Sequence, residues 1–265
     1  TAHTRQILCI EDKLVLLIDT QPQVAAQAES EIRRGLKPAP GVRFIMAEDA
    51  SANNVLWRKK IESLVHPTFA AQNNRLFYQT HNSLCCLDIR NGEPLWQSAT
   101  DPLELKGREV GWESPTLVVQ NKVVYSADFK RMIALSVEDG RKLWAGDSWQ
   151  GYNSPPDVFV IEGLVWTKDK NVTRIGLDPA TGMLKREFPT IKGYMHHRCY
   201  RNKATDRFLL RGNQGVQFVD IQSGEIWQNY WIRGTCQYGI MPANGLLYVT
   251  PDSCACNLTT KLNGF

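Results

Sequence analysis

Short apolar runs separated by polar turns follow one another along the whole chain. Runs such as residues 75–78 (RLFY) and 122–125 (KVVY) contain many β-branched and aromatic residues. Runs of this length and composition predict short strands, and the polar turns predict close connections between antiparallel neighbours. The pattern therefore predicts an all-β chain.

A recurring phrase follows these runs: an apolar residue with Asp or Ser, a tight turn that ends in Gly, and a strand that usually carries Trp. The four copies read LDIRNGEPLW, LSVEDGRKLW, LDPATGMLKR and VDIQSGEIWQ. Their turn glycines are Gly92, Gly140, Gly182 and Gly224, spaced by 48, 42 and 42 residues. An Asp or Ser that binds its own backbone, followed four residues later by Gly at positive φ, is typical of a hairpin. Each period then holds about four short strands, the size of one propeller blade.

Two further segments fit the repeat less completely. Residues 5–62 offer four strands with Trp57 in the Trp position, and residues 238–265 begin a last blade that stops before its turn. We therefore predict a β-propeller of four-stranded antiparallel blades, with about six blades or partial blades in one domain that spans residues 1–265. An insertion at about residues 20–42 replaces a hairpin, and its centre, residues 24–36, predicts a surface helix. A lid or a partner-binding segment is the alternative for this insertion.

Charge and hydropathy exclude some classes of function. The chain has 31 Lys and Arg against 27 Asp and Glu, a net charge of +4, with both signs spread along its length. Because no basic run is present, we expect no nucleic-acid binding. No apolar stretch reaches the roughly 18 residues of a membrane span, and no signal peptide precedes the first strand. The chain reads as a mature or excised piece.

The repeat resembles that of the quinoprotein-like (PQQ-repeat) β-propellers. That family includes quinone-dependent dehydrogenases and non-enzymatic outer-membrane assembly lipoproteins, so the resemblance implies a fold more strongly than a function. Residues 151–167, 196–210 and 234–256 resemble a largely uncharacterised branch of planctomycete-type bacteria. The resemblance to that branch implies a partial propeller from a parent of seven or eight blades. It also implies an extracytoplasmic location, periplasmic or secreted.

Quinone binding in this family needs a Ca²⁺ site, an Asp base and often a disulfide between adjacent cysteines. Cys85 and Cys86 are adjacent, but they occupy the third-strand position of an ordinary repeat. We expect them to be two small strand residues that face opposite sides of the sheet. Because no matching acidic cluster is recognisable, we do not expect PQQ.

The last two blades contain Cys and His residues that the other blades lack. These candidate zinc ligands are His196, His197, Cys199, Cys236, Cys254 and Cys256. Residues i and i+2 of a strand share a face, so His197 with Cys199 forms one pair and Cys254 with Cys256 another. Together they would complete a tetrahedral structural zinc site with three sulfur ligands and one nitrogen ligand. His196 and Cys236 are reserve ligands.

Two other states of these cysteines remain open. A disulfide could join Cys199 to Cys254 or Cys236 to Cys256 in an oxidising compartment. Alternatively, the thiols could stay unlinked. The spacings HxC and CxC are less specific than the CxxC pairs of zinc knuckles.

The segment around His196 is also loosely similar to the zinc-containing propeller polysaccharide lyases called ulvan lyases. Their β-elimination on uronate glycans needs a base, an acid and a cation that neutralises the carboxylate. The catalytic candidates that this similarity implies are His66, His81, Tyr152, Tyr200, Arg198 and Arg201. Each of them also has a structural interpretation as a turn, loop or anchoring residue.

The charged segment at residues 201–207 predicts a solvated turn, with a sugar- or phosphate-binding patch as the functional alternative.

Taken together, these features of the sequence predict a non-catalytic binding or scaffold propeller with a structural zinc site in its last two blades. A protein or carbohydrate ligand would bind on the propeller face. The alternatives are a uronate-glycan lyase and, behind it, a PQQ-dependent oxidoreductase.

Overall fold

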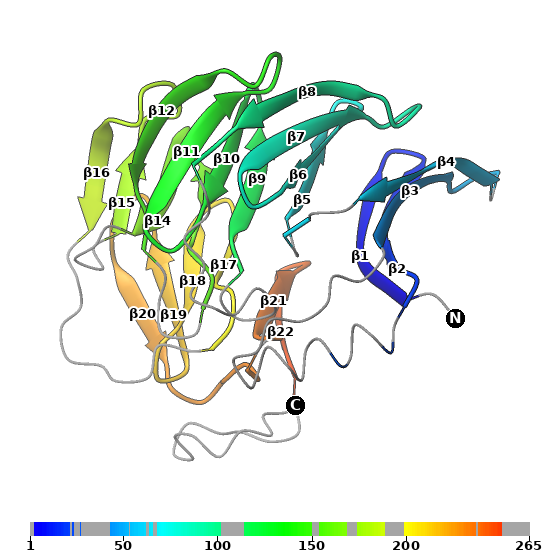
Figure 1. The fold of residues 1–265 in the computed structure, drawn as a ribbon. Helices are drawn as coiled ribbons and strands as arrows, with labels where there is room; N and C mark the ends of the chain where they lie inside the picture. The colour runs from blue at the N-terminus through cyan, green and yellow to red at the C-terminus, as the bar shows by residue number, and fades with distance from the viewer. Residues whose placement is uncertain are drawn as a thin grey trace. The chain divides into compact units, whose positions relative to one another are not determined.

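The structure is a computed structural model, and the part of the chain that it describes contains 22 β-strands (Figure 1). It describes residues 3–21, 23, 27, 43–52, 54–61, 64–65, 68–101, 114–149, 154–168, 174–188, 199–236 and 238–250. Five sheets have four strands and a sixth has two, and in each sheet the strands are hydrogen-bonded in chain order. The predicted all-β class is confirmed, with about six blades.

The first three sheets follow the predicted repeat. The first consists of β1 (His3–Ile10), β2 (Lys13–Asp19), β3 (Arg43–Asp49) and β4 (Asn54–Ile61). The second consists of β5 (Phe69–Gln72), β6 (Arg75–Gln79), β7 (Ser83–Asp88) and β8 (Pro94–Ala99). The third consists of β9 (Thr116–Gln120), β10 (Val123–Ala127), β11 (Arg131–Ser136) and β12 (Lys142–Asp147).

The remaining sheets include the incomplete last one. The fourth consists of β13 (Phe159–Ile161), β14 (Leu164–Lys168), β15 (Arg174–Leu177) and β16 (Leu184–Phe188). The fifth consists of β17 (Lys203–Ala204), β18 (Phe208–Gly212), β19 (Val216–Asp220) and β20 (Ile226–Asn229). The sixth pairs β21 (Ile240–Ala243) with β22 (Leu246–Val249).

The chain forms two compact units. Unit 1 comprises Thr1–Val110, Ser114–Ser126 and Ile133–Leu143, and unit 2 comprises Gly111–Glu113, Ala127–Met132 and Trp144–Phe265. The third sheet contributes residues to both units. The prediction of one domain over residues 1–265 stays a prediction.

Inside each unit, the aromatic residue of an outer strand packs over the turn glycine of the following sheet. The pairs are Trp57 over Gly92, Trp96 over Gly140, Trp144 over Gly182, and Phe188 over Gly224. The contact leaves no space for a side chain, since a Cβ on Gly182 would lie 2.7 Å from the Trp144 ring. The indole N–H of Trp144 also donates a hydrogen bond to the backbone oxygen of Pro179, at 2.8 Å. The repeated Gly and Trp therefore encode contacts between successive blades as well as hairpins.

Cys85 and Cys86 lie on β7 and face opposite sides of the sheet, as predicted. Cys85 packs with Tyr78 in one hydrophobic cluster, and Cys86 packs with Phe77 in another. Neither forms a disulfide. Burial raises the pKa of the Cys86 thiol to about 12, so both cysteines behave as small core residues.

The insertion is described only in part. Gln23 and Gln27 are helical and exposed, and the rest of the helix predicted at residues 24–36 lies outside the described residues. In the part of the chain that the structure describes, we find no helix of the length and apolar character needed to cross a membrane.

Candidate functional site

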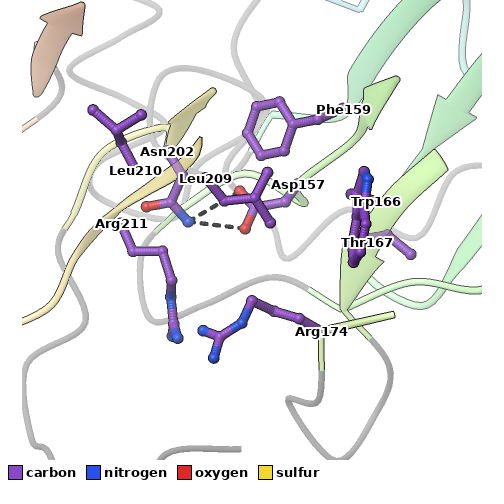
Figure 2. A pocket seen from close by; sticks show the side chains of 9 residues that line it. All are labelled: Asp157, Phe159, Trp166, Thr167, Arg174, Asn202, Leu209, Leu210 and Arg211. Carbon is purple, nitrogen blue, oxygen red and sulfur yellow. Dashed lines mark hydrogen bonds between the residues drawn. The ribbon is translucent and has the colours of Figure 1, made fainter. Parts of the chain in front are cut away.

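A pocket opens between the fourth and fifth sheets, within unit 2. The space inside it is small, about 10 Å³, close to the room that one water molecule needs. The residues that line it come from β13, β14, β15, β18 and the segments that precede β13 and β17 (Figure 2). They are Asp157, Phe159, Trp166, Thr167, Arg174, Asn202, Leu209, Leu210 and Arg211.

A single carboxylate is held firmly at the edge of this pocket. Asp157 precedes β13, and its carboxylate accepts hydrogen bonds of 3.1 and 2.8 Å from the Nδ2 of Asn202. The Oδ1 of Asn202 in turn accepts a hydrogen bond from the backbone N–H of Gly212, at 3.2 Å. Lys168 forms an ion pair with Asp157 at 2.7 Å, and only 1% of the Lys168 side chain is exposed. Both members of this ion pair are therefore fixed in place and removed from water.

Two buried arginines complete the charged side of the pocket. Arg174 begins β15 and is 3% exposed, whereas Arg211 lies on β18 and is 8% exposed. Their guanidinium groups extend into the same part of the pocket (Figure 2). Burial and the charge of Arg211 lower the pKa of Arg174 to about 9, with Asp157 opposing the shift. Burial likewise lowers the pKa of Lys168, again against the attraction of Asp157.

These pKa shifts reflect burial first and the neighbouring positive charges second. Four described cations, Lys168, Arg174, Arg201 and Arg211, interact electrostatically with the one carboxylate of Asp157. Lys168 and Arg174 even lie directly opposite each other in the register of β14 and β15. Like charges at such a cross-strand position are destabilising. Several like charges are therefore buried close together in unit 2.

The cations Lys168 and Arg174 are specific to the fourth sheet, because the matching positions in the other copies of the repeat carry no charge. Arg174 lies three residues before Leu177, the first residue of the repeated phrase. The residues at the same position in the other copies are fully buried and apolar: Leu84, Met132 and Val216. Lys168, which faces Arg174, likewise replaces Gln79, which faces Leu84. The blade architecture therefore does not require these cations.

Sequence reasoning missed this cluster of Asp157, Lys168, Arg174 and Arg211. A signal was present, because Arg174 interrupts an apolar position of the repeat. Arg211 and Asp157 gave no comparable signal, since neither interrupts a repeated apolar position. Only the fold brings them beside Lys168.

Several of the predicted site residues lie outside the described residues. These are His66, Tyr152, His196, His197, Arg198, Cys254 and Cys256. Of the other predicted zinc ligands, Cys199 and Cys236 belong to unit 2, and both are half-buried. Among the described residues, no three His, Cys, Asp or Glu side chains are grouped so that they could hold a metal ion.

The three described catalytic candidates have different surroundings. His81 is exposed in the turn between β6 and β7 in unit 1. Tyr200 is buried in unit 2, and its ring packs over Gly239 in a cluster with Leu210. Burial lowers the pKa of Arg201 to about 10, against the attraction of the Asp157 carboxylate.

The segment at residues 201–207 differs from the predicted solvated turn. It contains β17, and Asn202 is buried where it binds Asp157. Exposure is confined to Asp206 and Arg207. The prediction failed for the first half of the segment because a carboxylate distant in sequence supplies partners for its polar side chains.

A second feature of unit 2 is a concentration of exposed aromatic side chains. The large exposed aromatic residues of the described chain all lie between positions 227 and 248: Trp227, Tyr230, Trp231, Tyr238 and Tyr248. Trp231 is 67% exposed. Single exposed apolar residues are common, but exposed aromatic residues gathered in one part of a chain are typical of binding surfaces.

Comparison with known proteins places these features in context. The model of a family described as outer membrane protein assembly factor BamB matches residues 39–110 and 82–234. BamB from Moraxella catarrhalis has a similar structure, with a TM-score of 0.56 and 15% identity over 93% of this chain and 83% of that protein. No curated protein sequence matches.

Two dehydrogenases share the fold over smaller parts of their own length. A europium-containing methanol dehydrogenase gives a TM-score of 0.51 and 12% identity, covering 84% of this chain and 50% of that enzyme. The quinohemoprotein alcohol dehydrogenase from Comamonas testosteroni gives 0.52 and 12%, covering 84% and 42%. At these identities the likeness concerns the propeller fold alone.

Proposed function

Because this chain belongs to the family of the outer membrane protein assembly factor BamB, we propose that it is a non-catalytic propeller scaffold that binds a protein partner. Propellers carry many unrelated functions, so family membership alone does not decide the matter. The observation that carries the proposal is the set of exposed aromatic residues between positions 227 and 248. Trp and Tyr dominate the energetics of protein–protein interfaces because each buries a large, rigid area at a low cost in side-chain entropy.

Site-specific photo-cross-linking in the native host tests this proposal. A photoreactive amino acid at Trp231 or Tyr238 should yield a cross-linked protein adduct. Met183 provides the matched control, because it is an exposed apolar residue of the same unit, at 63% exposure, but it lies outside the aromatic segment. An equal yield of adducts from all three positions, or no adduct from any, would contradict the proposal.

The affinity of the purified protein for the partner captured by cross-linking provides a second test. Trp231→Ala and Tyr238→Ala should each weaken binding about tenfold or more, as interface aromatic residues do. The melting temperature should change little, because exposed substitutions alter the free energy of unfolding by less than about 0.5 kcal/mol. Unchanged affinity would show that the partner binds elsewhere.

We also propose the structural zinc site, with His197, Cys199, Cys254 and Cys256 as ligands and His196 and Cys236 in reserve. The proposal rests on the spacing of these residues in the sequence. Elemental analysis of purified protein should find about one zinc per chain. Cys199→Ser should lower both the zinc content and the melting temperature, whereas Cys9→Ser, at an exposed cysteine of β1, should change neither. Protein without zinc whose thiols titrate as pairs would favour a disulfide.

An extracytoplasmic location fits this proposal, since it is the usual location of BamB-like propellers.

The lyase and quinone-oxidoreductase alternatives stay predictions from the resemblance. Uronate glycans incubated with the protein would reveal a lyase by the ultraviolet absorbance of the unsaturated product, and calcium with a quinone absorption band would reveal an oxidoreductase.

A further inference from the structure

The outer edge of the fifth sheet lacks the protection that the other sheets have. β20 (Ile226–Asn229) is the last strand of this sheet, and no described strand pairs with its outer side. Natural proteins protect such edges against the addition of a foreign strand with Lys or Pro. The last strands of the other four-stranded sheets each carry one: Lys60 on β4, Pro94 on β8, Lys142 on β12 and Lys185 on β16. β20 has the sequence IWQN, with no proline and no charged residue.

Part of the backbone of β20 points away from its neighbour β19. The backbone N–H of Asp220 donates a hydrogen bond to the carbonyl oxygen of Glu225, at 2.9 Å, where the two strands meet their turn. In an antiparallel pair, hydrogen-bonded positions alternate with positions that are not hydrogen-bonded. Counted along the register from this bond, Trp227 is bonded to β19, whereas the N–H and C=O groups of Ile226 and Gln228 face outward. These are the groups that an added strand uses.

Two exposed tryptophans lie on β20 and directly after it. Trp227 is 42% exposed, and its ring packs edge-on against Phe208 with the ring centroids 5.6 Å apart. The backbone that carries Trp231 is held by Asn229, whose Oδ1 accepts a hydrogen bond of 2.9 Å from the Trp231 N–H. The same oxygen accepts a hydrogen bond of 3.2 Å from the N–H of Ile232. Because these groups are already ordered, a partner that covers them loses little affinity to their immobilisation.

We propose that β20 receives an extended segment of the protein partner as a fifth strand of this sheet. The outward N–H and C=O groups of Ile226 and Gln228 bind its backbone, and Trp227 and Trp231 pack against its side chains. β20 is short, so the tryptophans add to an affinity that the backbone alone would leave weak. The inference rests on the protein-binding function proposed above and specifies the partner: a segment rich in β-branched and aromatic residues, without Pro.

Selection of random short peptides, displayed on phage, against the purified chain tests the proposal without the native partner. The recovered peptides should have the composition just described. In hydrogen–deuterium exchange, an excess of a recovered peptide in synthetic form should slow the exchange of the backbone N–H groups of Ile226 and Gln228. If no peptide is recovered, or if the recovered peptides leave both N–H groups unprotected, the proposal is wrong.

Two substitutions at one position isolate the backbone contribution. Gln228→Pro removes the outward N–H, whereas Gln228→Ala keeps it. Both lose the hydrogen bond of 3.0 Å from the Gln228 side chain to the backbone oxygen of Asn213, so they are matched in that respect. Gln228→Pro should raise the Kd of the peptide about tenfold or more relative to Gln228→Ala, as the loss of a hydrogen bond and a blocked approach require. Equal Kd values for the two variants would show that the edge is not used.

The exchange measurement uses the unmodified chain, so it decides the matter even if the proline variant does not fold. It also separates this proposal from the one on which it rests. A partner that cross-links at Trp231 but leaves the N–H groups of Ile226 and Gln228 unprotected would support the scaffold function and refute strand addition. Protection of both N–H groups by the peptides, with no adduct in the native host, would support the edge as a strand-binding site and contradict the scaffold function.

Discussion

Asp157→Asn should destabilise unit 2 by about 3–5 kcal/mol, as expected when one member of a buried ion pair is removed. The substitution keeps the size of the side chain, so the loss reflects charge. Lys168, Arg174 and Arg211 would then be buried without a carboxylate among the described residues of the pocket. Asn202 would also lose its charged hydrogen-bond acceptor.

Removal of a cation should have a different effect. In Lys168→Met, Asp157 keeps its hydrogen bonds from Asn202 and the attraction of both arginines. The repulsion between Lys168 and Arg174, which face each other across the strands, disappears. Lys168→Met should therefore cost at least about 2 kcal/mol less than Asp157→Asn, and replacement of a buried ion by an apolar residue can even be stabilising.

Urea unfolding followed by circular dichroism measures these differences from the shifts in midpoint. Asp206→Asn serves as the control, because it makes the same chemical change at an exposed carboxylate of unit 2. It should alter the free energy of unfolding by less than about 0.5 kcal/mol. Equal losses for Asp157→Asn and Lys168→Met would refute the net positive character of the cluster.

Gly182→Ala should destabilise the protein by about 2–5 kcal/mol, the sum of two contributions. The first is the cost of positive φ, about 1–2 kcal/mol for a residue with a Cβ. The second is the clash with the Trp144 ring, which the new Cβ would approach to 2.7 Å. Overpacking of this kind typically costs about 1–3 kcal/mol.

Gly163→Ala separates the two contributions. Gly163 has a φ of 71°, almost equal to the 70° of Gly182, and lies in the same unit, but a Cβ there would meet nothing within 4 Å. It should therefore show only the backbone cost, about 1–2 kcal/mol. Thermal unfolding of the two variants gives the comparison. If both lose the same stability, the packing of Trp144 on Gly182 contributes nothing beyond the turn conformation.

The strands could be predicted because their information is local. The run at residues 75–78 lies within β6. The run at residues 122–125 lies in β10 and in the turn before it. Gly92, Gly140, Gly182 and Gly224 all have positive φ, as the hairpin phrase required. The four strands expected in residues 5–62 are β1 to β4, with Trp57 packed over Gly92.

The repeated phrase did not predict which aromatic ring packs over which turn glycine. Its third copy lacks Trp at the usual place, and Phe188 takes that role over Gly224. In the fourth copy Trp227 is exposed. Tyr200, a catalytic candidate by resemblance, packs over Gly239 in the way that the tryptophans pack over their glycines. These exchanges depend on which ring reaches which turn in space, a property that spacing along the chain does not contain.

Local sequence patterns predict the class of this protein: short strands, hairpins at a period of 42–48 residues, and a propeller repeat that the BamB family shares. Such features depend on residues close in sequence, where propensity and turn chemistry act. The position of the buried charges relative to one another follows from the fold and could not be predicted from the sequence. Asp157, Lys168 and Asn202 come from separate segments of the chain, and the fold brings them into contact and buries them. Electrostatic energy depends on distance and solvent exposure, and both are properties of the fold.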